Sequence, residues 1–173
     1  LLSYLSIAMS KIDQVFKNNE KWKLVSIDGT DKSNFIYEYL LPLKHNKDDN
    51  IIGTSICMVN GKFGVLNNLG NEIIKPIYKS IKILSDDLLL LMQDKKDNKN
   101  NFGLANFEGK LLQPVDFTHF IPLYSLMKYS YPIKNKEGIL QKNDNYFWIQ
   151  KNGHLTLLSK SEVDALKKYF KQN

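Results

Sequence analysis

The sequence has one cysteine, Cys57, and no arginine among its 173 residues. A single cysteine excludes an internal disulfide bond and a cysteine-based metal site, and it is compatible with a reducing compartment. Because hydrophobic residues make up 43% of the sequence, a core can form without such cross-links.

Long apolar runs are also lacking. The densest is Leu88–Met92, far short of the ~18 residues that a membrane-spanning helix needs, so no transmembrane segment is predicted. Leu1–Met9 matches the apolar end of a signal peptide but lacks a basic segment before it. We therefore expect it to belong to a helix of the fold, with cell-envelope and secreted locations kept as alternatives to the cytoplasm.

Positive charge is in excess, with 24 basic residues against 18 acidic ones and a net charge of +6. This balance favours an acidic partner. All 24 basic residues are lysines, however, and reading of base edges favours the planar fork of arginine. Richness in Lys, Asn and Ile is also what an AT-rich genome produces, so the sequence argues against nucleic acid as the partner.

Apolar residues near the start of the chain are spaced by 3, 4, 3 and 4 positions, which is the stripe of an amphipathic helix. We predict a helix over 1–18; a membrane-surface helix or a signal remnant is the alternative. The stripe consists of Leu2, Leu5, Met9, Ile12 and Phe16.

From residue 20 the sequence changes to short apolar runs separated by Gly, Asn, Asp and Pro, which is typical of antiparallel strands. An aromatic residue is followed by glycine seven positions later three times, and six positions later once. The aromatic residues recur at steps of about 40 residues, in the range of repeat architectures. The pairs are Trp22 and Gly29, Phe63 and Gly70, Phe102 and Gly109, and Phe147 and Gly153.

Other glycines and prolines recur in the two best copies. Gly64 and Gly103 directly follow the aromatic residue, where the missing side chain lets a neighbouring strand or ring approach the backbone closely. Gly70 and Gly109 follow polar residues, where a tight turn requires a positive φ. Pro76 and Pro114 close the phrase, and because proline cannot donate to a strand ladder, we expect them to end a strand.

The last third of the chain aligns in two ways, through Phe147 or through a match of 133–140 to 59–66, and the sequence does not decide between them. Two variable loops, at 44–50 and 94–101, interrupt the pattern with polar and charged residues. At the end of the chain, Ser159 and Glu162 form a capping-box pattern. It predicts a C-terminal helix over 159–171.

The phrase VNGKFGVLNNLGNEIIKPIYKSI resembles the WG repeat of bacterial proteins. In that repeat a polar Gly-Lys turn precedes an aromatic-glycine pair, and a polar-Gly turn, an apolar strand and a proline follow. Phe63-Gly64 and Phe102-Gly103 stand where the Trp-Gly pair stands in the family, whereas Trp22 is followed by Lys23. The resemblance covers 51–120 well, and 20–50 and 125–158 weakly. It implies an all-β array of hairpins that serves binding, in a bacterial protein.

Together these patterns predict a mainly β single domain over 1–173. Three to four WG-like antiparallel β-hairpin repeats over 20–158 form a solenoid-like or barrel-like array. A helix lies at each end.

Catalytic chemistry is not indicated by the sequence. His45, His119 and His154 are far apart and have no partner at a metal-ligand spacing, and His119 is predicted to be a strand residue. Cys57 alternates along an apolar strand, which predicts a buried small side chain. We predict no catalytic residue, no metal site, no cofactor and no enzymatic activity.

Aromatic and lysine side chains are the candidates for contact with a partner, because Tyr and Trp are enriched at interface hot spots. Along 146–148, strand alternation predicts that Phe147 is buried and that Tyr146 and Trp148 are more exposed. The partner-binding candidates are Tyr146, Trp148, Tyr129, Tyr131, Lys95, Lys96 and Lys99.

Repeat arrays present an extended surface on which variable loops set specificity. We therefore expect a non-enzymatic module that binds another protein with an acidic surface, for example as an inhibitor or immunity protein. One alternative is a cell-envelope or carbohydrate-binding module that uses exposed Tyr and Trp. Another is a regulatory part of a larger protein.

Overall fold

The computed structural model describes residues 14–18, 21–25, 29, 31, 36–44, 52–67, 69–85, 87–95, 99–122, 138–150 and 152–172. Its backbone groups into two compact units. Unit 1 comprises 1–79 and 107–109, and unit 2 comprises 80–106 and 110–173. The single domain predicted over 1–173 stays a prediction.

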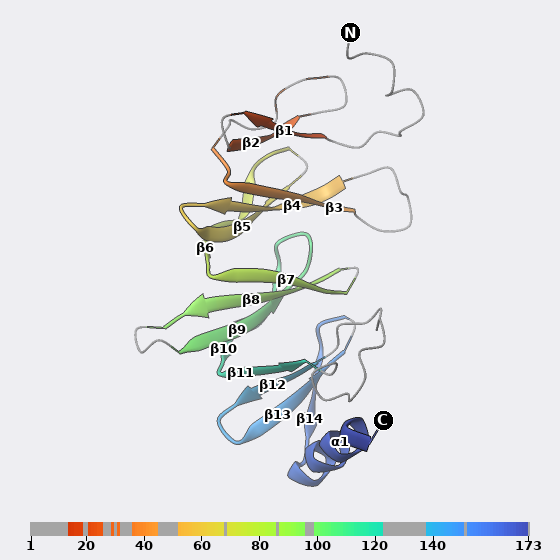
Figure 1. The fold of residues 1–173 in the computed structure, drawn as a ribbon. Coiled ribbons are helices and arrows are strands. Elements are labelled where there is room, and N and C mark those ends of the chain that lie inside the picture. Colours follow the sequence, from red (N-terminus) through yellow and green to blue (C-terminus); the bar gives the residue numbers. More distant parts are fainter. Residues whose placement is uncertain are drawn as a thin grey trace. The chain divides into compact units, whose positions relative to one another are not determined.

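Unit 1 contains a hairpin and one four-stranded antiparallel sheet (Figure 1). The hairpin consists of β1 (Gln14–Asn18) and β2 (Lys21–Val25). The sheet has the order β3-β4-β5-β6, so each strand pairs with the next strand of the chain. Its strands are β3 (Tyr39–Lys44), β4 (Ile52–Val59), β5 (Lys62–Asn67) and β6 (Glu72–Tyr78).

Unit 2 contains two further four-stranded antiparallel sheets, each again in chain order, followed by one helix. The first sheet consists of β7 (Ser80–Ser85), β8 (Leu88–Asp94), β9 (Asn100–Ala105) and β10 (Leu111–Phe117). The second consists of β11 (His119–Pro122), β12 (Gly138–Lys142), β13 (Asn145–Ile149) and β14 (Leu155–Leu158). The helix, α1, spans Lys160–Gln172.

The predicted mainly β, antiparallel fold is confirmed, and so is the C-terminal helix. Ser159 Oγ accepts from the backbone N–H of Glu162 (3.2 Å), and Glu162 Oε2 accepts from the N–H of Ser159 (2.7 Å), which is the predicted capping box. None of the described sheets closes into a barrel. No helix in the described ranges has the length and apolar character to cross a membrane.

The N-terminal helix is not confirmed. Gln14–Asn18 form a strand that pairs with Lys21–Val25, so the prediction over 1–18 is wrong for these five residues. β-branched Val15 and aromatic Phe16 favour strands, and the ladder to β2 satisfies their backbone groups. Residues 1–13, which carry most of the apolar stripe, lie outside the described part of the chain.

Gly64 and Gly103 occupy matching bulges. Between the pairs Phe63–Tyr78 and Val65–Ile74, β5 has one residue, Gly64, and β6 has three. Gly103 likewise faces three residues of β10, between the pairs Phe102–Phe117 and Leu104–Gln113. A Cβ atom on Gly64 would lie 2.5 Å from the carbonyl oxygen of Ile74. The close approach predicted at both glycines is therefore confirmed, and the neighbour is a strand.

The two prolines do not end their strands. Pro76 lies within β6 and Pro114 within β10, and both strands are at the edge of a sheet, where a missing N–H donor is tolerated. They are also not structural counterparts. In one bulge Pro76 lies opposite Gly64. In the other, the residue opposite Gly103 is Val115, which is one position after Pro114.

The glycines aligned after the aromatic residues share a left-handed conformation. Gly70 and Gly109 have φ +82°, Gly153 +79° and Gly29 +86°, which confirms the positive φ predicted at Gly70 and Gly109. In three turns the N–H of the first residue donates to the carbonyl oxygen of the fifth residue, and the left-handed glycine is the fourth residue. These turns are Asn67 to Asn71, Asn106 to Lys110 and Gln150 to His154. The turn at Gly153 thus matches the turns at Gly70 and Gly109.

Each unit has its own apolar core. In unit 1, Leu40, Cys57 and Leu66 from the sheet pack with Tyr37 and with partly buried Trp22 of β2. In unit 2 the core joins both sheets and holds the aromatic residues of the repeated phrase, Phe102 and Phe147, at its edge. Its buried members are Leu84, Leu88, Leu90, Leu104, Phe117, Leu140 and Ile149.

Gly103→Ala should destabilise the protein by about 1–3 kcal/mol, because overpacking at a site that cannot relax costs this much. The new Cβ atom would lie 2.7 Å from Val115 Cγ2 and 2.9 Å from both Gln113 O and Val115 Cα. Urea unfolding measures the change. Gly61→Asn is the control, because Gly61 has φ +69° and no atom near its Cβ position, and asparagine adopts this conformation. An equal loss in both variants would contradict the steric explanation.

Candidate functional site

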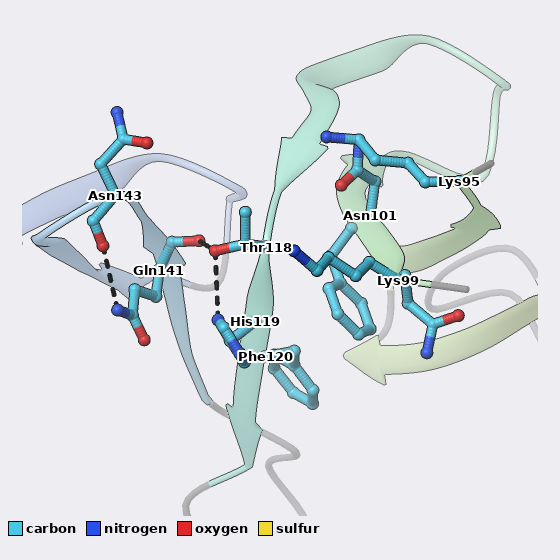
Figure 2. Close-up of a pocket in the computed structure, with 10 residues that line it drawn as sticks. Lys95, Lys99, Asn101, Thr118, His119, Phe120, Gln141 and Asn143 are labelled. Atoms are coloured by element: carbon cyan, nitrogen blue, oxygen red, sulfur yellow. Dashed lines mark hydrogen bonds between the residues drawn. The ribbon is translucent and has the colours of Figure 1, made fainter. Parts of the chain in front are cut away.

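A pocket of about 540 Å³ opens in unit 2 beside Thr118, the residue between β10 and β11. Figure 2 shows the strand with Thr118, His119 and Phe120 in the middle, with Lys95, Lys99 and Asn101 on one side and Gln141 and Asn143 on the other. The lining residues are Lys95, Lys99, Asn100, Asn101, Phe102, Thr118, His119, Phe120, Gln141 and Asn143.

One wall of the pocket is an extended hairpin. In unit 1, β4 and β5 join through the two-residue turn Asn60–Gly61. In unit 2 the ladder between β8 and β9 continues to the pair Asp94–Asn100, and the N–H of Lys95 donates to the carbonyl oxygen of Lys99 (2.7 Å). Within the loop predicted at 94–101, Asp94, Asn100 and Asn101 are thus strand residues, and Lys95 and Lys99 line the pocket. Residues 96–98 lie outside the described part of the chain.

The middle of the pocket is a hydrogen-bonded corner. The backbone N–H and the Oγ1 hydroxyl of Thr118 both donate to the carbonyl oxygen of Gln141, at 2.8 and 3.2 Å. His119 Nδ1 lies 3.1 Å from Thr118 Oγ1 and is the donor of that pair when the hydroxyl donates to Gln141.

The opposite wall is the turn between β12 and β13. Lys142 pairs with Asn145, so Asn143 and Asp144 form a two-residue turn, and Asn143 has φ +54°. Gln141 Nε2 donates to the carbonyl oxygen of Asn143 (3.0 Å), and this hydrogen bond stabilises the turn. Lys142 Nζ binds Asp116 Oδ2, which neutralises both charges behind the turn.

The pocket is basic and partly aromatic. None of the described residues that line it is acidic, whereas Lys95 and Lys99 each bring a positive charge. The rings of Phe102 and Phe120 form its apolar part, with centroids 6.3 Å apart. Asn101 is 8% exposed, and its Nδ2 donates to the carbonyl oxygen of Val115 (3.2 Å). Such a surface suits a ligand that carries negative charge.

Of the predicted partner-binding residues, the structure brings together Lys95 and Lys99. Tyr146 and Trp148 are half-buried on β13 and are not among the pocket's lining residues, and Tyr146 lies under Lys167, with Nζ 5.7 Å from the ring centroid. Lys96, Tyr129 and Tyr131 lie outside the described residues. Half-buried Phe147 packs its ring on that of Phe117, with centroids 5.7 Å apart.

Sequence reasoning missed most of the pocket. The prediction that His119 is a strand residue is confirmed, but no sequence pattern places it beside Gln141 and Asn143. Gln141 and Asn143 come beside it through the pairing of β11 with β12, and the β8–β9 hairpin lies on the other side of β11. The one available signal was the polar insertion at 94–101, which lengthens the hairpin toward this corner.

Cys57 is fully buried, as predicted. Burial, together with the nearby Glu72 carboxylate, raises the pKa of its thiol to about 12, so the thiolate does not form at neutral pH. In the part of the chain that the structure describes, no three His, Cys, Asp or Glu side chains gather as a metal site would require.

Comparison of the chain with protein-family models, with curated proteins and with solved structures finds no match. The WG-repeat resemblance therefore stays a prediction.

A corner of the same construction occurs in unit 1 at Glu38. Its N–H donates to the carbonyl oxygen of Met58 (2.8 Å), two residues before the turn of the hairpin. Its carboxylate accepts from the N–H groups of Asn60 (2.9 Å) and Gly61 (3.0 Å), one on each oxygen, and Lys21 Nζ is 3.5 Å away. The N–H of Gly61, followed by that of Asn60 and the Lys21 charge, lowers the pKa of the Glu38 carboxyl.

This lowered pKa predicts a pH dependence of stability. A carboxyl with a lower pKa in the folded chain stabilises the fold above its ordinary value of 4.5, and the stabilisation is lost as the pH falls through the folded pKa. Glu38→Gln should therefore be less stable than the unmodified protein at neutral pH, and the difference should shrink in acid.

Urea unfolding from neutral pH to about pH 3 measures this difference. Glu108→Gln, at an exposed glutamate in another turn, is the matched control. A stability difference for Glu38→Gln that does not change with pH would show that the carboxylate charge has no role at the corner.

Proposed function

We propose that the chain is a non-enzymatic binding module that holds another protein through an acidic surface. The observation that carries this proposal is the extended β8–β9 hairpin, which brings Lys95 and Lys99 to a pocket with no acidic residue among its described lining. An inhibitor or immunity protein that masks an acidic surface is one form of such a module.

Electrostatics support this choice of partner. Lys95 and Lys99 are both exposed, and the net charge of +6 has the same sign. Charges on an accessible rim attract an oppositely charged partner over about 10 Å at moderate salt, and this attraction speeds association and disfavours wrong partners. At the base of the hairpin, half-buried Met92 pairs with half-buried Phe102, which pairs in turn with buried Phe117.

A WG-like repeat array is the architecture that we propose for this module. Two transverse rows of side chains support it, because the strand pairs place Met58, Phe63 and Tyr78 side by side in one sheet and Met92, Phe102 and Phe117 in another. Each row runs from methionine through phenylalanine to another aromatic residue. The two sheets differ in the length of the connection between their second and third strands, β4–β5 in one and β8–β9 in the other. Specificity in such an array resides where copies differ.

Reversing both pocket charges, by Lys95→Glu with Lys99→Glu, should weaken binding of the partner by about tenfold or more. The tagged protein and its variants are used as bait in lysate of the native organism, and captured proteins are quantified by mass spectrometry. Binding should also weaken as the salt concentration rises.

The control is the pair Lys82→Glu and Lys110→Glu, which changes the net charge equally at exposed lysines of unit 2 outside the pocket. Thermal unfolding verifies that both double variants fold. Equal capture of an acidic protein by both variants would place its binding surface elsewhere, and capture of no acidic protein would contradict the proposal.

A further inference from the structure

The two lysines of the pocket stand opposite each other on one face of the β8–β9 hairpin. The N–H of Lys95 donates to the carbonyl oxygen of Lys99 (2.7 Å), one position beyond the last pair of the ladder. Opposite residues of an antiparallel pair share a face, with Cβ atoms about 5 Å apart, and like charges there repel. Asp94 belongs to the neighbouring pair, so its side chain points to the other face. Lys95 and Lys99 form no ion pair with a described acidic residue, and an anion between them would remove the repulsion.

The apolar part of the pocket lies beside the edge of β9. The pairing of β10 with β9 ends at Phe117–Phe102, and the chain then turns through Thr118 into β11, whereas β9 continues beyond this point. Residues from both faces of this continuation line the pocket, Lys99 from one face and Phe102 from the other. Lys99 and Phe102 are three residues, or about 10 Å, apart along the strand.

The rings of Phe102 and Phe120 are held in place and remain partly open. The Phe120 ring lies against the backbone of Gly138, where a Cβ atom would overlap the ring and lie 2.7 Å from its Cζ. Phe102 packs beside it, with centroids 6.3 Å apart, and both side chains are half-buried. Figure 2 shows the Phe120 ring on the same side of the central strand as Lys95 and Lys99. A fixed apolar surface therefore accompanies two exposed cations.

The lysines and the rings contribute differently to the binding of a protein. Exposed charges speed association and reject wrong partners, whereas affinity comes mainly from side chains that fill a desolvated pocket. An acid alone would use the lysines and leave the open parts of the rings in water. In an extended segment, residues two positions apart share a face and lie about 7 Å apart. The flexible four-carbon stem of lysine covers the rest of the distance to the rings.

We propose that the pocket recognises an extended segment of the partner protein in which an Asp or Glu and a large apolar residue stand two positions apart. The carboxylate lies between the ammonium groups of Lys95 and Lys99, and the apolar side chain packs on the rings of Phe102 and Phe120. The protein source of the segment rests on the proposed function, whereas its acidic and apolar chemistry rests on the pocket.

The first test is an NMR titration of the ¹⁵N-labelled full chain with two capped peptides, Ser-Glu-Ser-Leu-Ser and Ser-Leu-Ser-Glu-Ser, which present both orders. The tighter binder should shift the amide signals of Phe102 and Phe120. It is then compared with three relatives of itself, in which glutamine replaces glutamate, alanine replaces leucine, or leucine moves next to glutamate. Each change should weaken binding by about tenfold, because it removes the charge, the apolar side chain or their common face.

Each relative tests one part of the proposal. Equal binding of the glutamine peptide would overturn the carboxylate, equal binding of the alanine peptide would overturn the apolar residue, and equal binding of the rearranged peptide would overturn the spacing. Oligogalacturonate, an acidic saccharide, tests the other source of carboxylate. Tighter binding of oligogalacturonate than of the peptide would overturn the protein source.

The second test changes the rings. Phe120→Ala removes one ring, and Gly138→Ala displaces it. In both variants the preference for the leucine peptide over the alanine peptide should fall from about tenfold to less than about threefold, because residues in contact do not act additively. The preference for glutamate over glutamine should stay. Thermal unfolding verifies the fold of each variant, and an unchanged leucine preference in a folded variant would overturn the ring assignment.

The third test changes the lysines. Lys95→Gln with Lys99→Gln should abolish the preference for glutamate and keep the preference for leucine. Lys82→Gln with Lys110→Gln removes the same charge at exposed lysines outside the pocket and is the control. Equal loss of the glutamate preference in both double variants would overturn the placement of the carboxylate.

The outcomes for pocket and partner are separable. If the peptide binds as expected and lysate yields no acidic protein, the recognition chemistry of the pocket stands and the proposed function fails. If an acidic protein is captured equally by folded Phe120→Ala and by the unmodified chain, the proposed function stands and the apolar contact fails.

Discussion

Apolar contact between successive sheets is the interaction on which unit 2 depends. A four-stranded antiparallel sheet that stands alone leaves an apolar face in water. Leu84, Leu90 and Leu104 of one sheet cover Leu140 and Ile149 of the next, and each fully buried side chain of this kind contributes about 1.5–3 kcal/mol. Thr118 directly follows Phe117 of this core, and Gln141 directly follows Leu140, so packing positions the two residues that form the corner.

The fold was predictable where a local rule acts on a few neighbouring residues. Glycine is required at Gly70 and Gly109 by a positive φ, and at Gly103 by the strand that crosses it, and the capping box requires Ser159 and Glu162. Prediction failed where the pairing of strands outweighs a local sequence pattern. At Gln14–Asn18 a helical spacing of apolar residues gave way to the ladder with β2, and the edge position of β10 let its proline remain inside the strand.

The candidate site could be predicted only in part, for a related reason. Lys95 and Lys99 were visible because an insertion interrupts a repeated phrase. Gln141 and Asn143 were not, because they reach Thr118 only through the register of β11 on β12, across 123–137, which the structure does not describe. The likeness of the Thr118 and Glu38 corners is similarly hidden, because it consists of backbone hydrogen bonds that residue types do not record.

The extended β8–β9 hairpin has a base that belongs to the sheet and an end that projects beyond it. Its base, with Met92 opposite Phe102, keeps the register of the sheet, and its tip beyond Gln93 and Asn101 extends from that base. Residues added in matched pairs beyond this point would keep every side chain at the base on its own face, whereas a single added residue within the ladder would reverse them. Such a hairpin can change in length while the packing at its base stays the same, a route by which closely similar domains can acquire different surfaces at one corner of the fold.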